Sequence, residues 1–201
     1  RDALGADNEI RVICSDIDRK IVHDYLNKIF KDTLFCPDPE PFYHFKFSTP
    51  ETYNSLKNQS KVIVAAINRD LGNPGVKLLK KILPEEQYLS TLKNDPVILS
   101  RDVFSNKQLF MIINANTDTS LLKNIESKSN SYRRIFNEHF KLRQEQYLAY
   151  ENRNIKLEDT LQTDFGWNMN IPWGWIKIKS DKDSNFVWIG KEMPFQWVGI
   201  S

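Results

Sequence analysis

The stretch KVIVAAIN, residues 61–68, decides the fold predicted for this chain. Six apolar residues follow one another in it without an alternating polar partner. A strand that is exposed on one face alternates apolar and polar residues, whereas a continuous apolar run is typical of a strand covered on both faces. The run therefore predicts the central strand of a sheet with helices packed on it.

Further strands and helices are indicated around this run. The other early strands are EIRVICS (9–15), FYHFKFS (42–48) and the residues from Gln108 to Ala115. Helices are indicated after Asp16, after Thr49, within residues 70–97 and, as the longest one, from Asp118. Helices between strands imply crossover connections, and the hairpin described below implies antiparallel pairing. The expected fold class is α+β, a mixed β-sheet packed against helices with a C-terminal antiparallel Trp-rich hairpin.

The composition is that of an ordinary folded domain. The chain has 201 residues, of which 40% are hydrophobic, and we expect one α+β domain over residues 1–201. The net charge of +2 is too small to favour nucleic acid as a partner. No apolar stretch approaches the ~18 residues that a membrane span needs.

The two cysteines allow two interpretations. Cys14 lies in an apolar strand, and Cys36 begins the stretch CPDPEPF (36–42). Two buried or half-buried thiols are one interpretation, and a single disulfide is the alternative if the protein is exported. The alternating prolines of this stretch favour extended polyproline geometry, so we expect a stiff connector there.

Three of the five tryptophans lie in IPWGWIKIKSDKDSNFVWIGKEM, residues 171–193. A four-residue loop at Asp181–Ser184 would pair two strands whose residues sort into two faces. The aliphatic face, expected to be core, carries Ile176, Ile178, Val187 and Ile189. The aromatic face carries Trp173, Trp175, Lys177, Lys179, Phe186, Trp188 and Glu192.

The aromatic face is the candidate binding site. In the predicted register, Lys177 and Trp188 form a cation–π pair and Trp175 covers Gly190. Wetted indoles on one face would form a large apolar patch. Either another layer of protein covers this face, or it binds a partner. The candidate partner-binding residues are Trp173, Trp175, Lys177, Phe186 and Trp188.

Catalytic and metal-binding patterns are not evident in the sequence. His23, His44 and His139 belong to no recognised ligand or catalytic motif, and no phosphate-binding glycine loop is present. We expect no cofactor, no metal site and no assigned catalytic residues. A hydrolase whose site is assembled from distant residues is kept as the third reading.

Four stretches taken together resemble an uncharacterised family of Bacteroidota lipoproteins, catalogued as domain-of-unknown-function family 4837. They are ALGADNEIRVI, PDPEPFYHFKFS, SRDVFSNKQLFMIINA and GWNMNIPWGWIKIKSDKDSNFVWIGKE. The matching motifs are the proline connector Pro37–Phe42, the segment Asp102–Gln108 before a strand, and the hairpin Ile171–Gly190. The chain departs from the family pattern at Gly190, where arginine is usual, and at Trp175, where tyrosine is common.

The resemblance implies an extracytoplasmic location in the cell envelope, at the periplasm or outer membrane. It implies a lipid anchor upstream of Arg1, and a chain that is the N-terminal part of a longer exported protein. It favours the disulfide alternative and a covered aromatic face, and it implies no reaction. We therefore expect a non-catalytic module that docks another envelope protein. The alternative is a glycan- or peptide-binding module that uses the Trp-rich hairpin face.

Overall fold

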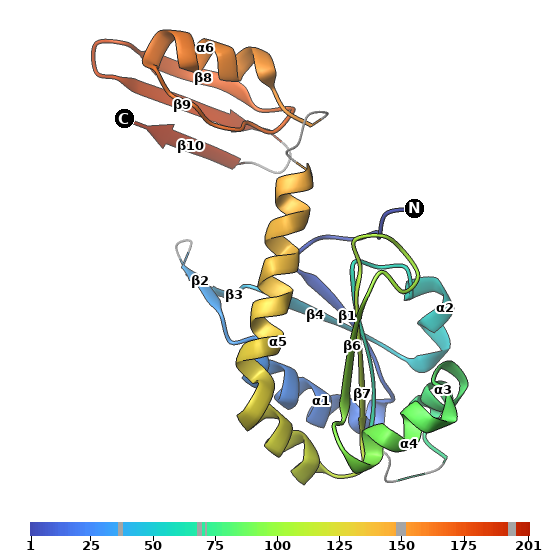
Figure 1. Cartoon of the computed structure of the whole chain (residues 1–201). Coiled ribbons are helices and arrows are strands. Elements are labelled where there is room, and N and C mark those ends of the chain that lie inside the picture. Colours follow the sequence, from blue (N-terminus) through green and yellow to red (C-terminus); the bar gives the residue numbers. More distant parts are fainter. Residues whose placement is uncertain (36–37, 68–69, 71, 148–151, 193–195) are drawn as a thin grey trace. The chain divides into compact units, whose positions relative to one another are not determined.

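The structure is a computed structural model that describes residues 1–35, 38–67, 70, 72–147, 152–192 and 196–201 (Figure 1). The sequence predicts one domain over residues 1–201. In the structure, the chain divides into two compact units, Arg1–Lys141 and Leu142–Ser201. Each unit has its own hydrophobic core. The expected α+β class is confirmed, with a mixed five-stranded sheet in the first unit and an antiparallel three-stranded sheet in the second.

The elements follow one another along the chain with short connections. Those that begin in the first unit are β1 (Glu9–Ile13), α1 (Asp16–Ile29), β2 (Thr33–Phe35), β3 (Pro39–Pro41), β4 (His44–Ser48), the 3₁₀ turn η1 (Pro50–Thr52), α2 (Tyr53–Leu56), β5 (Lys61–Ile67), α3 (Pro74–Ile82), α4 (Glu85–Lys93), β6 (Val97–Arg101), β7 (Leu109–Ala115) and α5 (Asp118–Tyr147). The second unit contains α6 (Ile155–Phe165), β8 (Ile176–Asp181), β9 (Phe186–Lys191) and β10 (Gln196–Ile200).

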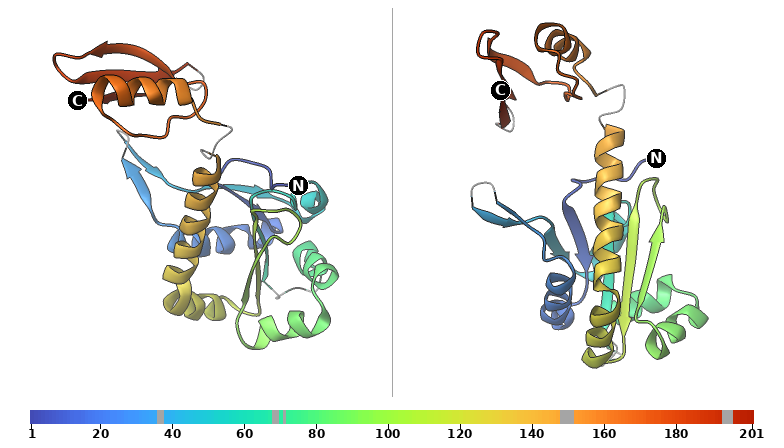
Figure 2. Two further views of the ribbon diagram at one scale, coloured as in Figure 1. Left: turned by 45° about the horizontal axis from the view of Figure 1, so that its top comes forward. Right: turned by 60° about the vertical axis from the view of Figure 1, so that its left-hand side comes forward.

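The central position predicted for the opening stretch is confirmed. The large sheet has the order β4-β1-β5-β7-β6, in which β6 alone runs antiparallel to its neighbour. Every residue of β5 is buried. Ile63, Ala65 and Ile67 pack with residues of α1 and α5, whereas Val62, Val64 and Ala66 pack with residues of α2, α3 and α4. Figures 1 and 2 show these two helical layers on opposite faces of the sheet.

The first residue of β5 is a buried lysine that the pattern of apolar residues does not predict. The side chain of Lys61 is fully buried, and its Nζ donates a hydrogen bond of 2.6 Å to the carbonyl oxygen of Asp7. The same Nζ lies 6.0 Å from the ring centroid of Tyr43 and 5.9 Å from that of Phe140. The aromatic faces and the carbonyl dipole together compensate for the water that the ammonium group loses on folding.

A buried carboxylate joins the helix starts at the carboxyl ends of β1 and β5. Oδ2 of Asp18 accepts hydrogen bonds from Ser15 Oγ at 2.9 Å, from the Ile67 backbone N–H at 3.2 Å and from Asn73 Nδ2 at 2.7 Å. The other side of the Asn73 amide caps α3 by accepting from Gly75 N at 2.8 Å. In doubly wound sheets the position between two such strands often holds a ligand. Here a protein side chain uses the hydrogen-bond donors at that position.

Three strands of the first unit, β2, β3 and β6, were not predicted. The proline stretch is a strand and not a polyproline connector, since Pro39–Pro41 pairs antiparallel with Thr33–Phe35. Successive N–H groups of a strand point to opposite sides, so the two prolines remove donors on one side only and Glu40 keeps its own. The third unpredicted strand is β6, which follows Pro96 and pairs with β7 at the edge of the large sheet.

The cysteine alternatives are resolved in part. Cys14 is a buried free thiol, which agrees with the interpretation of buried thiols. Burial raises the pKa of this thiol to about 12, so the thiolate is scarce at neutral pH. Cys36 lies outside the described residues.

The second unit is a sheet with one helix on it. Its strand order is β10-β9-β8, with antiparallel pairing throughout. Its buried core consists of Leu157, Leu161, Ile171, Val187 and Ile189, with Phe165, Trp167, Met169 and Trp175 packed against it. These contacts place α6 on one face of the sheet.

A partly buried ion pair joins α6 to the segment before the sheet. Glu158 is 8% exposed and accepts a hydrogen bond of 3.0 Å from Arg153 Nε, together with a second bond from Arg153 Nη2. Its Oε1 also accepts a bond of 2.7 Å from the Ile171 backbone N–H. The hydrogen bonds from Arg153 hold the pKa of Glu158 below its usual value, and the bond from Ile171 acts in the same direction.

The first prediction concerns the buried carboxylate. Replacement of Asp18 by alanine leaves the N–H of Ile67 and the amide of Asn73 buried without their acceptor, and we expect a loss of about 3 kcal/mol in the free energy of unfolding. Asp16, which is exposed in the same helical turn, is the matched control, and its alanine variant should lose about 0.5 kcal/mol or less. Urea unfolding followed by circular dichroism measures both, and equal losses would contradict the assignment.

The second prediction concerns the pH dependence of the second unit. Because the pKa of Glu158 is lower when folded than the unfolded value of about 4.3, its contribution to stability is complete above that value. The contribution is lost as pH falls through the lower folded pKa. Glu158→Gln should therefore cost about 1–2 kcal/mol at neutral pH and much less at pH ~3. Unfolding curves at the two pH values decide the point, and a cost independent of pH would contradict it.

Candidate functional site

The face of the C-terminal sheet opposite α6 is the candidate binding surface. Residues directly opposite each other in antiparallel strands share a face. Since Val187 and Ile189 face α6, Phe186, Trp188 and Gly190 lie on the other face of β9. The pairing adds side chains from both neighbouring strands. We call this surface the open face, made up of Ile176, Ile178, Lys179, Asp181, Phe186, Trp188, Gly190, Trp197 and Gly199.

A β-bulge in β8 decides which side chains reach the open face. Asp181 pairs with Phe186 and Lys179 with Trp188, but Lys177 pairs with Ile189, so the register shifts between Lys177 and Lys179. The extra residue reverses the faces of every β8 position before it. Ile176 pairs with Gly190 and therefore lies on the open face, while Lys177 lies on the α6 face.

The predicted core face of the hairpin is consequently half wrong. Val187 and Ile189 are buried, as predicted, at 0% and 4% exposure. Ile176 and Ile178, however, are 54% and 47% exposed. Trp175 lies just before β8 and packs against the α6 core, where the sequence predicted isoleucine side chains.

The five candidate residues do not lie together. Phe186 and Trp188 share the open face and are half-buried. Trp175 and Lys177 lie on the opposite side, and Trp173 is 75% exposed in the turn before β8. The predicted pair of Lys177 with Trp188 is wrong, because Lys179 is the residue opposite Trp188. The predicted cover of Gly190 by Trp175 is wrong as well.

The indole that covers Gly190 belongs to Trp197, which the hairpin prediction did not include. Trp197 pairs with Gly190, and Gly199 pairs with Trp188 in the same ladder. A Cβ at position 190 would come within 2.9 Å of Ile178 Cδ1 and 3.1 Å of Trp197 Cβ, so only glycine fits there. The rings of Trp188 and Trp197 pack edge to face with their centroids 6.0 Å apart.

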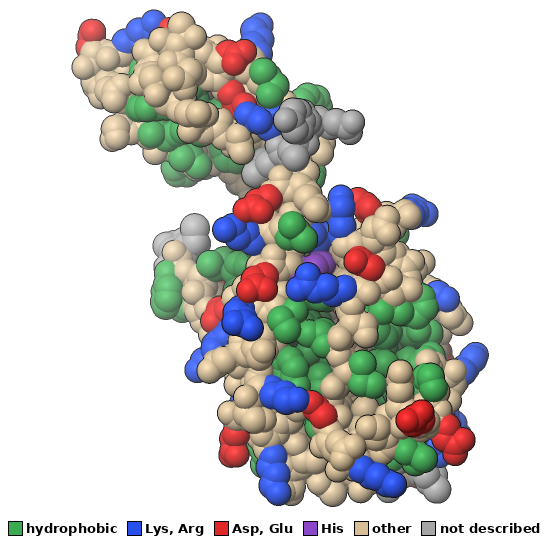
Figure 3. All heavy atoms as spheres, viewed as in Figure 1, with side chains coloured by type: hydrophobic (Ala, Val, Ile, Leu, Met, Phe, Trp, Pro, Cys, Tyr) green, Lys and Arg blue, Asp and Glu red, His purple; other side chains and the backbone are tan. Residues whose placement is uncertain are grey.

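The open face is exposed and mainly apolar. Trp197 is 67% exposed, more than either isoleucine of β8. In Figure 3, hydrophobic side chains are visible in the second unit below α6, in the region of β9 and β10. Contiguous apolar surface of this kind marks interaction sites on folded proteins more often than scattered exposed side chains do.

The turn of the hairpin explains the error in register. The predicted loop was Asp181–Ser184, whereas the observed loop is Lys182–Asn185. Asp181 ends β8 and accepts hydrogen bonds from Asp183 N at 3.0 Å and Ser184 Oγ at 2.8 Å. Asn185 has a φ of 51°, a left-handed conformation that asparagine tolerates better than most residues. Aspartate before the loop and asparagine at its end were the signals that could have placed it.

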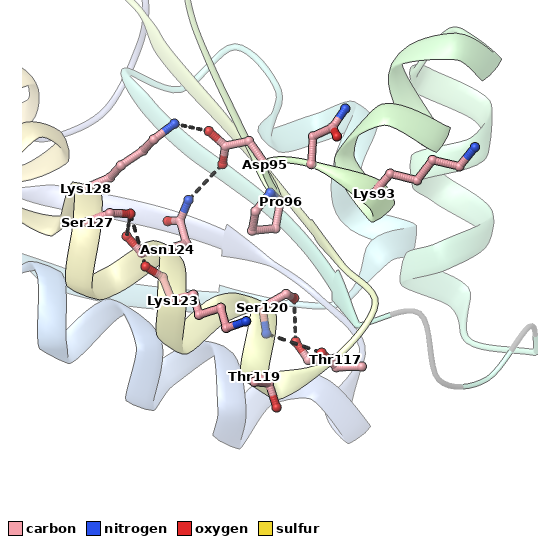
Figure 4. Close-up of a pocket in the computed structure, with 11 residues that line it drawn as sticks. Lys93, Asp95, Pro96, Thr117, Thr119, Ser120, Lys123, Asn124, Ser127 and Lys128 are labelled. Carbon is pink, nitrogen blue, oxygen red and sulfur yellow. Dashed lines mark hydrogen bonds and ion pairs between the residues drawn. The ribbon is translucent and has the colours of Figure 1, made fainter.

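A polar pocket of about 460 Å³ lies in the first unit between the residues that precede β6 and the first turns of α5 (Figure 4). Its lining comprises Lys93, Asn94, Asp95, Pro96, Thr117, Thr119, Ser120, Lys123, Asn124, Ser127 and Lys128. Lys128 forms an ion pair with Asp95, which raises the pKa of the lysine. Hydroxyl and ammonium groups dominate this lining, so its chemistry suits water or small anions.

Asn124 forms the floor of the pocket and links three parts of the unit. Its Oδ1 accepts from the Tyr25 hydroxyl at 2.7 Å, and its Nδ2 donates to Asp95 Oδ1 at 2.8 Å and to the Tyr132 hydroxyl at 3.1 Å. Burial raises the pKa of both tyrosines, so they stay neutral donors and acceptors. The network has the saturated character of a structural contact among α1, α5 and the start of β6.

The three histidines that a dispersed hydrolase site could use lie on three different elements of the first unit, α1, β4 and α5. His23 is exposed on α1 beside Asn27, and His139 is buried on α5 with its Nε2 3.1 Å from the Lys107 carbonyl oxygen. His44 lies on β4, and neither histidine nor cysteine is among the residues that line the pocket of Figure 4. Among the described residues, no group of three or more His, Cys, Asp or Glu is placed to hold a metal ion.

Comparison of the chain with protein-family models, with curated proteins and with solved structures finds no match. In the part of the chain that the structure describes, no helix combines the length and the apolar character that crossing a bilayer requires.

The third prediction separates two neighbouring tryptophans. Trp175→Ala removes an indole that packs on the α6 core, and we expect a loss of about 2 kcal/mol in the stability of the second unit. Trp173→Ala removes an exposed indole in the preceding turn and should change stability by about 0.5 kcal/mol or less. Unfolding followed by near-UV circular dichroism compares the two. A larger loss at position 173 would contradict the described faces.

Proposed function

We propose that the chain is a non-catalytic module of the cell envelope that docks another protein on the open face of its C-terminal sheet. The observation that carries the proposal is the exposure of Trp197, Ile176 and Ile178 on one side of a sheet whose other side is packed. Interface cores are enriched in aromatic residues and depleted in charge. The pairing assigns two charged side chains to the open face, Lys179 and Asp181, and Asp181 lies at its end beside the hairpin loop.

The envelope location in this proposal is supported by the sequence resemblance to the lipoprotein family. A hydrophobic docking surface on a lipid-anchored module suits a partner held at the same membrane, because anchoring raises the effective concentration of both. The partner is expected to present an apolar or aromatic ridge with few charges.

A second candidate function rests on the indole pair itself. Trp188 and Trp197 pack edge to face, and Trp197 exposes most of its ring. Exposed ring faces of this kind also stack on the apolar faces of sugar rings and on the side chains of extended peptides. Glycan or peptide binding is therefore the alternative to protein docking at the same surface.

The fourth prediction tests the open face by affinity capture from detergent-solubilised envelopes of the source cells. Replacing both Trp197 and Ile176 by serine removes the most exposed apolar side chain of β10 and that of β8. We expect the double variant to capture at least about tenfold less of a partner that the unchanged chain retains, in keeping with the weight of central aromatic residues in interfaces.

Trp173→Ser is the matched control, since it removes an exposed indole that lies in a turn outside the sheet. This variant should capture the partner as the unchanged chain does. Equal capture by the double variant, or no specific partner for the unchanged chain, would overturn the docking proposal. Retention of defined oligosaccharides that is lost only in the double variant would support the glycan alternative.

A further inference from the structure

β10 is an edge strand with none of the usual protection against pairing with another strand. It is the outer strand of the order β10-β9-β8, and none of its five residues is buried. Its sequence, QWVGI, contains no charge and no proline. Edge strands present a row of free backbone N–H and C=O groups, and proteins normally block them with charges, prolines or bulges.

The opposite edge of the same sheet is protected in that usual way. β8 carries Lys177, Lys179 and Asp181, and its ladder is broken by the bulge at Ile178. The contrast between the two edges indicates that β10, and not β8, is suited to receive a further strand.

The sequence of β10 is complementary to itself. A two-fold axis through Val198 would pair Trp197 of one copy with Gly199 of the other, and the reverse. The chain already uses this combination twice, since Trp197 pairs with Gly190 and Gly199 pairs with Trp188. A large ring beside a residue without a side chain lets two aromatic residues lie on one face without collision. The same fit would therefore repeat across the axis.

We propose that two copies of this chain associate through antiparallel pairing of β10 with β10, centred on Val198. The result is a continuous six-stranded sheet with an isologous contact, in which Val198 meets Val198 and Trp197 of each copy meets Gly199 of the other. Because the axis is perpendicular to the sheet, both open faces lie on the same side. Trp197 and Trp188 of the two copies then form one uninterrupted aromatic surface.

The fifth prediction is a dimer in solution. Sedimentation equilibrium of the chain over a concentration series should give a mass that approaches twice the 23.6 kDa of one copy. Val198→Lys places two ammonium groups opposite each other across the axis and should weaken association by at least about tenfold. Ser180→Lys adds the same charge to the protected edge strand β8 and should leave association unchanged.

Cross-linking tests the register, in a Cys36→Ser background where the remaining Cys14 is buried. Two Val198→Cys copies would face each other directly, with Cβ atoms about 4.5–5.5 Å apart, a separation that a disulfide can bridge. Two Gln196→Cys copies would stand roughly 14 Å apart along the strands. We expect the first variant and not the second to form a covalent dimer under mild oxidation.

Three results would overturn the inference: a monomer at every concentration, a dimer that Val198→Lys leaves intact, or equal cross-linking at positions 196 and 198. The inference does not depend on partner docking. Val198 pairs with Ile189, whose side faces α6, so its lysine variant leaves every side chain of the open face in place. Self-association and partner capture are therefore measured separately.

Discussion

The burial of β5 on both faces is the constraint from which the first unit is built. All seven residues of Lys61–Ile67 are buried, and alternate side chains enter two different cores. Such a strand is stable only when helices cover both sides, which requires crossover connections and a parallel arrangement around it. The small side chain of Ala66 and the lack of one at Gly75 let α3 approach closely, since a Cβ at Gly75 would lie 3.2 Å from the Ala65 carbonyl oxygen and from Ala66 Cβ. Asp18 and Asn73 then tie the starts of α1 and α3 to the end of this strand.

The spacing of apolar residues was sufficient to predict the elements that have a long pattern and a fully buried face. The central strand, the first helix and the long helix follow directly from the spacing of apolar residues. Short elements could not be predicted from this spacing. β6 has only five residues after a proline, and the β2–β3 ribbon depends on a strand of alternating prolines that local propensity disfavours. Lys61 shows the same limit for a single residue, because its burial depends on Tyr43 and Phe140, which are distant in the sequence.

The sequence predicted that the C-terminal sheet has an aromatic face, but it did not predict which residues of β8 and β10 contribute to that face. The alternation of β9 placed Val187 and Ile189 inward and Phe186 and Trp188 outward, as observed. The alternation of β8 failed because one extra residue exchanges the faces of all positions beyond it, and a bulge leaves little trace in composition. Trp197 was not assigned to the surface because it belongs to a third strand, and the sequence did not predict that this last strand pairs with β9 beside Trp188.

The close packing around Gly190 has a consequence for how this part of the chain can change over time. A side chain there would come within 2.7 Å of the Gln196 carbonyl oxygen, which is a backbone atom that cannot turn aside. Position 199 is more permissive, since its nearest neighbour is an atom of the Phe186 ring at 3.4 Å. Among descendants that keep this sheet, we expect position 190 to stay glycine, whereas the packing within one copy leaves room for a side chain at position 199. Any lineage that replaces the residue at 190 must also move its third strand.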